Sequence, residues 1–360
     1  MNKSELFEIR IDAPSEDAYA RAKKKFDALA KPLDGFGDFE DMICRIAAMQ
    51  KTDTPDISKK GLVIMIADNG VACHGVSQTD PSVTASVAKL LGKGKSTAGI
   101  MTEGYPLTVI PVDVGIDSDE KIPGIICKKA AKGTGNIAEG PAMTPEQCLL
   151  AIEAGMETAK DCRDKGISMI ATGEMGIGNT TTATALLCAL TGKKPAEVTG
   201  RGAGLSDEGL SKKIKVIEDA LALHRLGKRA PDREYAFSAL CSVGGLDIAA
   251  LTGLFIACAQ CHIPCVIDGL ISAAAAYAAQ LTVSGCRDYM IASHNGRERG
   301  CRILLEHLGL KSVIDADMAL GEGTGAVMLF PLLDMIMSVF NSGTRFTDAG
   351  IGQYERFDGC

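Results

Sequence analysis

The sequence has no excess of positive charge. Its 38 Lys and Arg residues are outnumbered by 45 Asp and Glu residues, which leaves a net charge of −7. This balance argues against nucleic acid and against an anionic membrane surface as partners. The first eight residues, Met1 to Glu8, are charged almost from the start and contain no apolar signal core. We therefore expect a cytoplasmic protein.

No export signal accompanies the thirteen cysteines, so we expect reduced thiols that pack as small core residues. One cluster, residues 258–265 (CAQCHIPC), has the ligand types of a zinc or iron–sulfur site. The sequence contains no second C-x-x-C motif, and the cluster lies in an apolar run typical of a buried helix followed by a strand. Core packing is therefore favoured over a metal site.

A membrane-spanning segment is not expected. The longest stretch without charged residues, 248–267, is long enough to cross a bilayer. However, it contains Gln260 and His262, and Asp247 and Asp268 flank it. We interpret this stretch as a buried helix that leads into a buried strand.

Five apolar runs alternate with helical patterns along the chain. A chain of 360 residues can form one large α/β domain with a smaller appendage. Each run is apolar throughout, as strands are when both faces of a parallel sheet are covered. We predict an α/β fold with an open parallel sheet of about six strands and helices on both faces. The predicted strands lie at 61–67, 107–114, 166–171, 264–268 and 289–293, with a sixth hidden in residues 128–141.

Polar residues follow these runs at the points where the strands end. Because the carboxyl ends of parallel strands meet at one edge of a sheet, we expect a single cleft there. The residues concerned are Asp68, Asp113, Thr172, Asp268 and Ser293.

The stretch from Thr172 to Leu186 has the strand, glycine turn and helix order of a phosphate-binding loop. It can be aligned with the Walker pattern G-x-x-x-x-G-K-[ST], but Asn179 replaces the lysine. Because that lysine neutralises the β- and γ-phosphates, its absence argues against a nucleoside triphosphate. Backbone N–H groups at a helix N-terminus suit a single phosphate. We predict a nucleotide monophosphate or a sugar phosphate, with an ordinary tight turn as the alternative.

A second glycine-rich turn, residues 200–210, precedes a helix that Ser206 is expected to cap and that carries Lys212, Lys213 and Lys215. Two glycine loops and nearby lysines could converge on one phosphate, although lysines on a helix often form only a solvated face. His294 follows the last predicted strand. It could act as an acid–base group or a phosphate donor, or simply bond to the backbone.

Two other classes of function fit less well. A dinucleotide-dependent oxidoreductase would need G-x-G-x-x-G after the first strand, and residues 68–71 (DNGV) do not supply it. A non-catalytic regulator that binds a nucleotide remains an alternative.

Taken together, the motifs make the chain similar to the nicotinate-nucleotide–dimethylbenzimidazole phosphoribosyltransferase family. The order and spacing of the shared stretches carry this resemblance, because any one glycine motif would be weak. The stretches extend over nearly the whole chain: 67–71 (ADNGV), 112–116 (VDVGI), 140–144 (GPAMT), 173–181 (GEMGIGNTT), 200–204 (GRGAG), 245–249 (GLDIA), 293–294 (SH) and 320–326 (LGEGTGA).

The resemblance implies an activity and an architecture. The activity is transfer of phosphoribose from nicotinate mononucleotide to 5,6-dimethylbenzimidazole, with inversion at C1′, to give the lower-ligand nucleotide of cobalamin. Neither a metal nor another cofactor is implied. The resemblance also implies a homodimer of chains with a large α/β domain, which we place at 56–325, and a small helical domain built from 1–55 and 326–360.

By motif match, the resemblance makes Glu322 the catalytic base and Glu174 a second active-site carboxylate. Glycines flank Glu322 at the start of an expected helix, whose N-terminus would keep the carboxylate ionised; a purely capping glutamate is the alternative. The residues expected to hold the nucleotide and its phosphate are Gly176, Gly178, Asn179, Thr180, Thr181, Gly202, Gly204, Lys213, Ser293 and His294. Those expected to contact the base are Ser77, Gln78 and Leu320.

The chain departs from the family in the segment that follows Ser77, where an aromatic-bearing stretch is expected. Residues 78–84 (QTDPSVT) are polar and lack tyrosine. Benzimidazole prefers apolar and aromatic walls. Another benzimidazole, a purine or a phenolic base is therefore an alternative acceptor.

Overall fold

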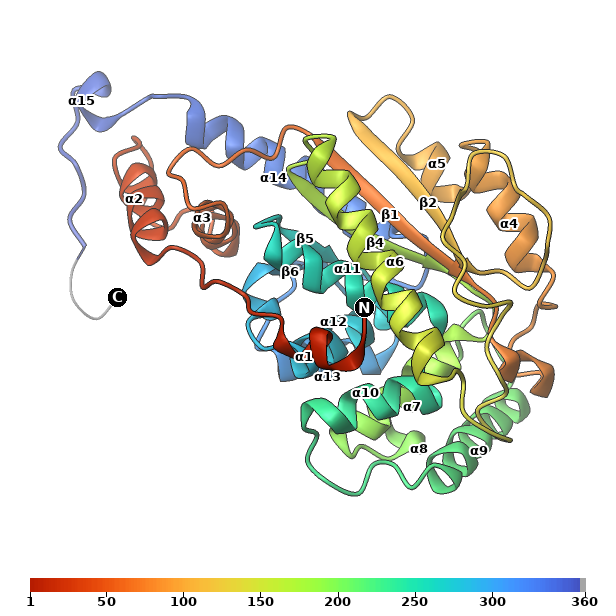
Figure 1. The fold of residues 1–360 in the computed structure, drawn as a ribbon. Coiled ribbons are helices and arrows are strands. Elements are labelled where there is room, and N and C mark those ends of the chain that lie inside the picture. The colour runs from red at the N-terminus through yellow and green to blue at the C-terminus, as the bar shows by residue number, and fades with distance from the viewer. Residues whose placement is uncertain (357–360) are drawn as a thin grey trace.

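A computed structural model describes residues 1–356 and contains a six-stranded parallel sheet in the order β3-β2-β1-β4-β5-β6 (Figure 1). A parallel pair, β7-β8, lies outside this sheet. The strands are β1 (Lys60–Ala67), β2 (Leu107–Gly115), β3 (Ile126–Cys127), β4 (Met169–Met175), β5 (Cys265–Ile267), β6 (Met290–Ala292), β7 (His294–Gly296) and β8 (Ile314–Met318).

The predicted sheet is confirmed, and all five expected strands belong to it. The sixth strand was expected within residues 128–141, which is wrong: it is β3, two residues long and just before that passage. The β7-β8 pair was not expected, because β8 (IDADM) is mostly exposed and lacks the continuous apolar run of the buried strands.

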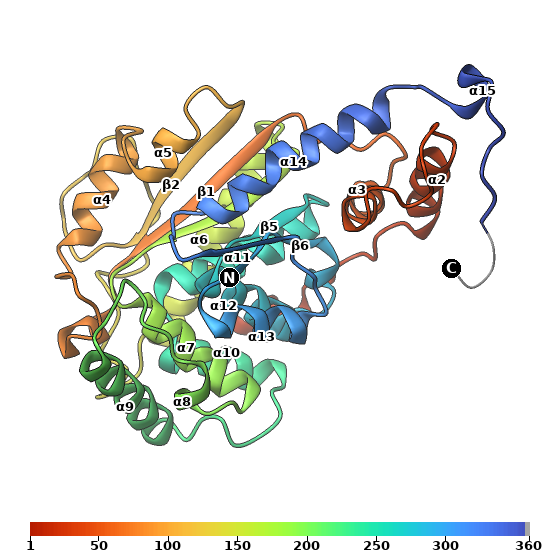
Figure 2. The same ribbon diagram turned by 180° about the vertical axis from the view of Figure 1, so that it is seen from behind.

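Helices cover both faces of the sheet. Figure 1 shows α6 in front of the sheet, and Figure 2, from behind, shows α14 crossing it. The α-helices are α1 (Lys3–Glu8), α2 (Glu16–Asp27), α3 (Asp38–Met49), α4 (Val83–Gly92), α5 (Thr97–Met101), α6 (Pro145–Asp164), α7 (Asn179–Thr191), α8 (Pro195–Val198), α9 (Asp207–Leu223), α10 (Arg233–Val243), α11 (Leu246–Gln260), α12 (Leu270–Thr282), α13 (Arg299–Leu308), α14 (Thr324–Asn341) and α15 (Phe346–Ala349).

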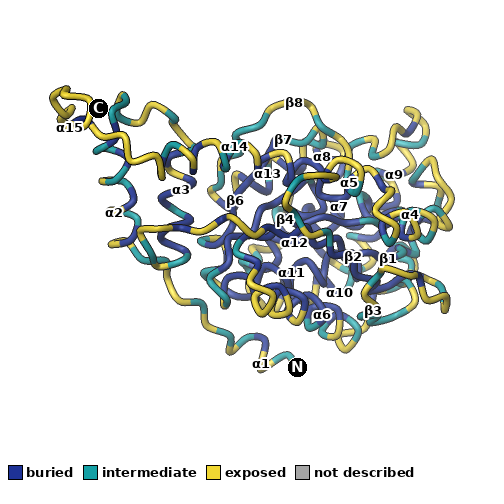
Figure 3. The backbone as a smooth tube through the Cα atoms, turned by 90° about the horizontal axis from the view of Figure 1, so that it is seen from above, coloured by how far each residue is buried: buried dark blue, intermediate teal, exposed yellow. Residues whose placement is uncertain are grey.

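A lobe away from the sheet combines segments from both halves of the chain, but the N-terminus itself lies elsewhere, where the Met1 amino group pairs with Glu153 of α6 (Figure 1). Helices α2, α3 and α15 form this lobe, and α14 runs into it from the sheet (Figure 1). The rings of Phe26 and Phe340 have centroids 4.8 Å apart, and Arg356 forms ion pairs with Asp27 and Asp34. In Figure 3, the buried backbone gathers around β4, α11 and α12, whereas the chain around α15 is mostly exposed.

Side-chain caps begin two helices, and the cap at Ser206 was predicted from the sequence. The Thr144 side chain accepts from the Gln147 N–H at the start of α6, and the Gln147 side chain accepts in return from the Thr144 N–H. The Ser206 hydroxyl accepts from the Gly209 N–H at the start of α9. Each such cap satisfies backbone donors that a helix cannot pair internally.

The cysteines belong mainly to the core. Cys258 and Cys265 are fully buried neighbours, and burial, together with their mutual contact, raises the pKa of the Cys258 thiol well above its ordinary value. Within residues 1–356, no cluster of three or more His, Cys, Asp or Glu side chains is arranged to hold a metal ion.

Helices α6 and α11 approach each other closely at glycines. A Cβ atom on Gly155 would lie 1.8 Å from the carbonyl oxygen of Ala250, and one on Gly253 would lie 1.9 Å from that of Ile152. Backbone atoms cannot yield to such an intrusion without the helices moving apart.

We therefore expect Gly155→Ala to lower the free energy of unfolding by roughly 1–3 kcal/mol, as overpacked cores do. Urea denaturation followed by circular dichroism measures the change. Gly140→Ala is the matched control, since a Cβ atom there would meet nothing within 4 Å. Equal stability of the two variants would contradict close packing at Gly155.

Candidate active site

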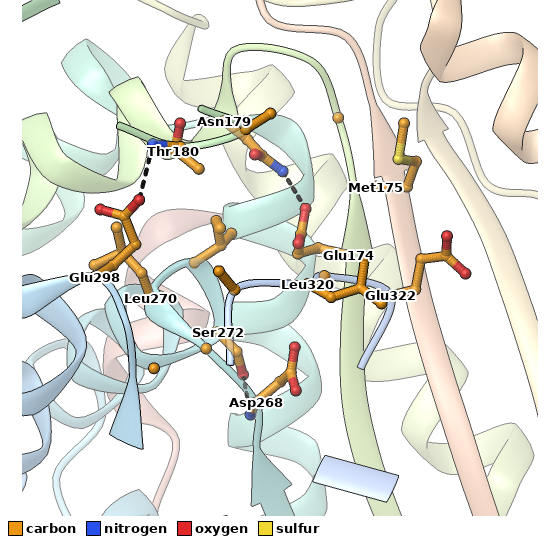
Figure 4. Close-up of a pocket in the computed structure, with 18 of the residues that line it drawn as sticks. Glu174, Met175, Asn179, Thr180, Asp268, Leu270, Ser272, Glu298, Leu320 and Glu322 are labelled. Atoms are coloured by element: carbon orange, nitrogen blue, oxygen red, sulfur yellow. Dashed lines mark hydrogen bonds between the residues drawn. The ribbon is translucent and has the colours of Figure 1, made fainter. Parts of the chain in front are cut away.

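A cavity of about 260 Å³ opens at the carboxyl ends of the strands (Figure 4). It lies at the ends of β4, β5 and β6, next to the point between β1 and β4 where the sheet order reverses direction. Open α/β sheets bind their ligands near such a switch point. The residues that line it are 174–180, 202–203, 268–272, 294, 296–298, 318–322 and Ser77.

The turn between β4 and α7 forms one wall. Gly178 takes a φ of +93°, a left-handed conformation that glycine adopts without strain, and the helix begins at Asn179. The Asn179 side chain is directed at neighbouring carboxyl groups. It donates hydrogen bonds to Glu174 and, at 3.0 Å, to Asp247. The residue in the Walker-lysine position therefore joins two carboxyl groups.

Glu174 is buried within this wall, at 8% exposure. Burial, with the nearby Asp247 carboxylate as second cause, raises the pKa of Glu174 to about 8. Burial likewise raises the pKa of Asp247 to about 6. Glu174 therefore carries a proton at neutral pH and can donate a hydrogen bond toward the cavity.

This shift predicts a pH dependence of stability. Between its ordinary pKa of 4.5 and about 8, Glu174 binds a proton in the folded chain but not in the unfolded one. Stability must therefore fall as pH rises through this window, by at most about 1.4 kcal/mol per pH unit for one proton.

The variant Glu174→Gln has no titrating proton at this position. Its free energy of unfolding, relative to that of the unaltered chain, should therefore increase as pH rises. Urea titrations at about pH 5 and about pH 8 measure the difference. A difference that stays constant between the two pH values would show that the pKa of Glu174 is not raised.

The second glycine loop lies opposite the first. Gly202 and Gly204 take φ values of +52° and +100°. Behind them, the buried Lys213 ammonium donates a hydrogen bond to the Thr180 hydroxyl at 2.8 Å, which links the two loops. Burial lowers the pKa of Lys213 to about 8, and the Glu298 carboxylate partly opposes that shift.

Glu322 lies at the end of the cavity beside α5. Its φ is +60°, its N–H donates to the Glu174 carbonyl at 3.2 Å, and its Oε2 accepts from the Ala98 N–H at 2.9 Å. The sequence suggested that the helix following Glu322 would stabilise the carboxylate. The structure instead gives its side chain a backbone donor in the first turn of α5.

Glycine is required beside this carboxylate. A Cβ atom on Gly321 would lie 2.4 Å from Oε1 of Glu174, and one on Gly173 would lie 2.8 Å from the backbone of Glu322. The two glutamates can therefore share one cavity only because these neighbours lack side chains.

His294 lies in the floor of the cavity and is 2% exposed. Its Nδ1 is 2.9 Å from the hydroxyl of Ser293, which donates to the Ile267 carbonyl at 2.7 Å. One ring nitrogen is thus held by the Ser293 side chain, while the ring also lines the cavity.

Several apolar side chains line the cavity. Met175, Ile177 and Leu320 line it together with Ser77. The lining contributed by residues 1–356 contains no Phe or Tyr, as the polar segment after Ser77 indicated. The Gln78 side chain does not line the cavity. It donates to the carbonyl of Gly204 instead.

Most of the residues predicted from sequence lie at this cavity. Those in its lining are Glu174, Glu322, Gly176, Gly178, Asn179, Thr180, Gly202, His294, Ser77 and Leu320. Those outside the lining are Thr181, Gly204, Lys213, Ser293 and Gln78. The Thr181 hydroxyl is buried and has no hydrogen-bond partner in residues 1–356.

Several lining residues were not predicted, among them Met175, Ile177 and Glu298. A signal existed for Glu298, because it lies in the polar loop that follows the last predicted strand. Met175 and Ile177 stand between predicted residues in the first glycine loop, and no local pattern indicates which way their side chains face.

Known proteins resemble this chain along nearly its whole length. A family described as phosphoribosyltransferase matches residues 11–351. A nicotinate-nucleotide–dimethylbenzimidazole phosphoribosyltransferase from Acetivibrio thermocellus is 40% identical over 333 residues, covering 92% of this chain and 93% of the relative. The protein of the same name from Ruminiclostridium cellulolyticum is 39% identical, covering 97% and 99%. The crystal structure of CobT from Thermus thermophilus superposes with a TM-score of 0.87 at 36% identity, covering 94% of this chain and all of that one.

Proposed function

Because this chain belongs to the nicotinate-nucleotide–dimethylbenzimidazole phosphoribosyltransferase family and is thus a pentosyltransferase, we propose that it acts in the cytoplasm on the substrates in that name. It transfers phosphoribose from nicotinate mononucleotide to 5,6-dimethylbenzimidazole or a related base. The products are nicotinate and α-ribazole 5′-phosphate, the lower-ligand nucleotide of cobalamin. The observation that carries the proposal is one cavity with two glycine loops at one end and Glu322 at the other.

The phosphate is assigned to the loop end of the cavity. The turn at Gly176–Gly178 and the loop at Gly202 face each other there, and the Lys213 ammonium joins them through Thr180. Backbone N–H groups with one buried cation suit a single phosphate. His294, in the floor of the cavity and bonded to Ser293, is assigned to the ribose.

The transfer needs one proton acceptor. The bond from C1′ to the pyridinium nitrogen breaks, and its electron pair leaves with nicotinate, which becomes a neutral ring. A nitrogen of the incoming base forms the new bond at C1′ from the opposite face, which inverts the configuration. The proton on the other ring nitrogen then passes to the Glu322 carboxylate, a general-base step worth roughly a hundredfold or more.

Glu174 has a different role from Glu322. With its pKa at about 8 it is a neutral hydrogen-bond donor at neutral pH. A neutral group beside C1′ leaves Glu322 as the acceptor, and two carboxyl groups with different protonation states are typical of acid–base sites.

The acceptor base is tested by competition. The apolar side chains of Met175, Ile177 and Leu320 support a flat apolar base. Because residues 1–356 contribute no Phe or Tyr to the lining, purines and phenols are the alternative acceptors. Incubation with nicotinate mononucleotide and equal amounts of dimethylbenzimidazole, adenine and phenol should release nicotinate and favour the benzimidazole product. A non-catalytic nucleotide-binding protein would release no nicotinate.

A homodimer belongs to the proposal. Exposed apolar side chains on the contacting helices α5 and α14 support it: Ile100, Met101, Met328 and Met335. Clustered exposed apolar residues mark association surfaces. Light scattering that gives the mass of a single chain would count against the dimer.

A further inference from the structure

Glu298 lies across the second glycine loop. Its Oε1 accepts a hydrogen bond from the Gly202 N–H at 2.9 Å (Figure 4). Its Oε2 is buried and has no hydrogen-bond partner among residues 1–356. A buried carboxylate oxygen without a partner costs free energy. In the observed position of Glu298, only one of the two carboxylate oxygens has a hydrogen-bond partner among residues 1–356.

The position of Glu298 in the chain makes this orientation unusual. Glu298 is the residue immediately before α13, where an acidic side chain commonly accepts from the first N–H groups of its own helix. No such bond is formed. The side chain reaches instead to the loop, where a Cβ atom on Gly200 would lie 1.6 Å from Oε2. Only glycine at position 200 permits this approach.

The groups around the Glu298 carboxylate are those that bind an anion. The Gly202 N–H is one donor, and the buried Lys213 ammonium, which Glu298 influences electrostatically, lies behind the loop. A phosphate assigned to this loop needs the same N–H and the same cation. Two anions cannot share a single N–H at hydrogen-bond distance, and their mutual repulsion is strong where water is scarce.

We propose that Glu298 competes with the nucleotide phosphate for the Gly202 amide and is displaced when the phosphate binds. Displacement exposes the unpartnered oxygen to solvent. The free energy gained by hydrating this oxygen offsets part of the free energy lost with the Gly202 hydrogen bond. Glu298 thereby determines specificity: only a ligand that carries a phosphate displaces it, whereas a nucleoside leaves it in place. This inference rests on the proposed assignment of the phosphate to the two glycine loops.

The test is calorimetric titration of Glu298→Gln with inorganic phosphate, nicotinate mononucleotide and nicotinate riboside. Glutamine keeps the size and the acceptor for Gly202 but removes the charge. We expect phosphate and the nucleotide to bind about tenfold more tightly to this variant, since one like-charge repulsion is removed, and the riboside to bind as before. Glu306→Gln, an exposed change on α13, the helix that follows Glu298, should alter none of the three affinities.

Unchanged or weaker binding of phosphate and nucleotide by Glu298→Gln would overturn the inference, because Glu298 would then support the loop. Tighter binding of all three ligands would also overturn it, because the Glu298 charge would then oppose ligands that carry no phosphate as well. Failure of the proposed function has a separate readout, namely no nicotinate release by the unaltered chain. The phosphate titration remains interpretable in that case.

Discussion

Glu322→Gln is expected to slow transfer of phosphoribose by about a hundredfold or more, while the affinity for nicotinate mononucleotide stays nearly unchanged. Glutamine can still accept the hydrogen bond that the Ala98 N–H donates to Glu322, so the loop should keep its shape. What is lost is the acceptor for the proton of the attacking base. Single-turnover kinetics measure the transfer rate, and calorimetry measures nucleotide affinity.

Glu139→Gln, at an exposed position outside the cavity, controls for the loss of one carboxylate. Transfer at the unaltered rate by Glu322→Gln would remove Glu322 from the role of base. Loss of nucleotide affinity with an unchanged rate would show instead that Glu322 shapes the binding site.

The second large effect is expected from Lys213→Met. Methionine has nearly the length of lysine and tolerates burial, but it cannot neutralise a phosphate or donate to the Thr180 hydroxyl. Hydrogen bonds to charged groups contribute about 1.5–3 kcal/mol, so the dissociation constant of the nucleotide should rise roughly tenfold to a hundredfold. The rate at saturating nucleotide should change much less.

Lys215→Met is the matched control, since Lys215 lies on the same helix, is exposed and pairs only with Asp219 among residues 1–356. Nucleotide affinity in Lys213→Met equal to that in Lys215→Met would mean that the phosphate lies elsewhere. A fall in rate without a change in affinity would assign Lys213 to the chemistry rather than to binding.

The sheet could be predicted because its strands are buried on both faces. A strand such as β1, with every residue buried, appears in the sequence as an uninterrupted apolar run. Strand β3 has two exposed residues and β8 is largely exposed. Neither forms a long continuous apolar run, so neither could be located.

The candidate site was predictable where backbone geometry depends on residue type. Gly178 and Gly202 need φ values that glycine adopts without strain, so the loops are visible in the sequence. Side-chain directions are not encoded in this local way. That Asn179 joins Glu174 to Asp247 and that Glu298 reaches Gly202 depends on tertiary contacts between residues far apart in the chain.

The ionisation of the site also lay beyond the sequence. Glu174 lies near the end of β4, and its burial near Asp247 raises its pKa to about 8. Two glutamates thus acquire different roles from their surroundings, one buried against carboxyl groups and one bonded to a backbone N–H.

A crystal structure with α-ribazole 5′-phosphate bound tests the account most directly. We predict that the phosphate lies between the Gly176–Gly178 turn and the Gly202 N–H, close to Lys213. The benzimidazole should lie against Met175 and Leu320, with its free ring nitrogen within hydrogen-bond distance of the Glu322 carboxylate. A nucleotide bound in the reverse orientation, or outside this cavity, would contradict the account.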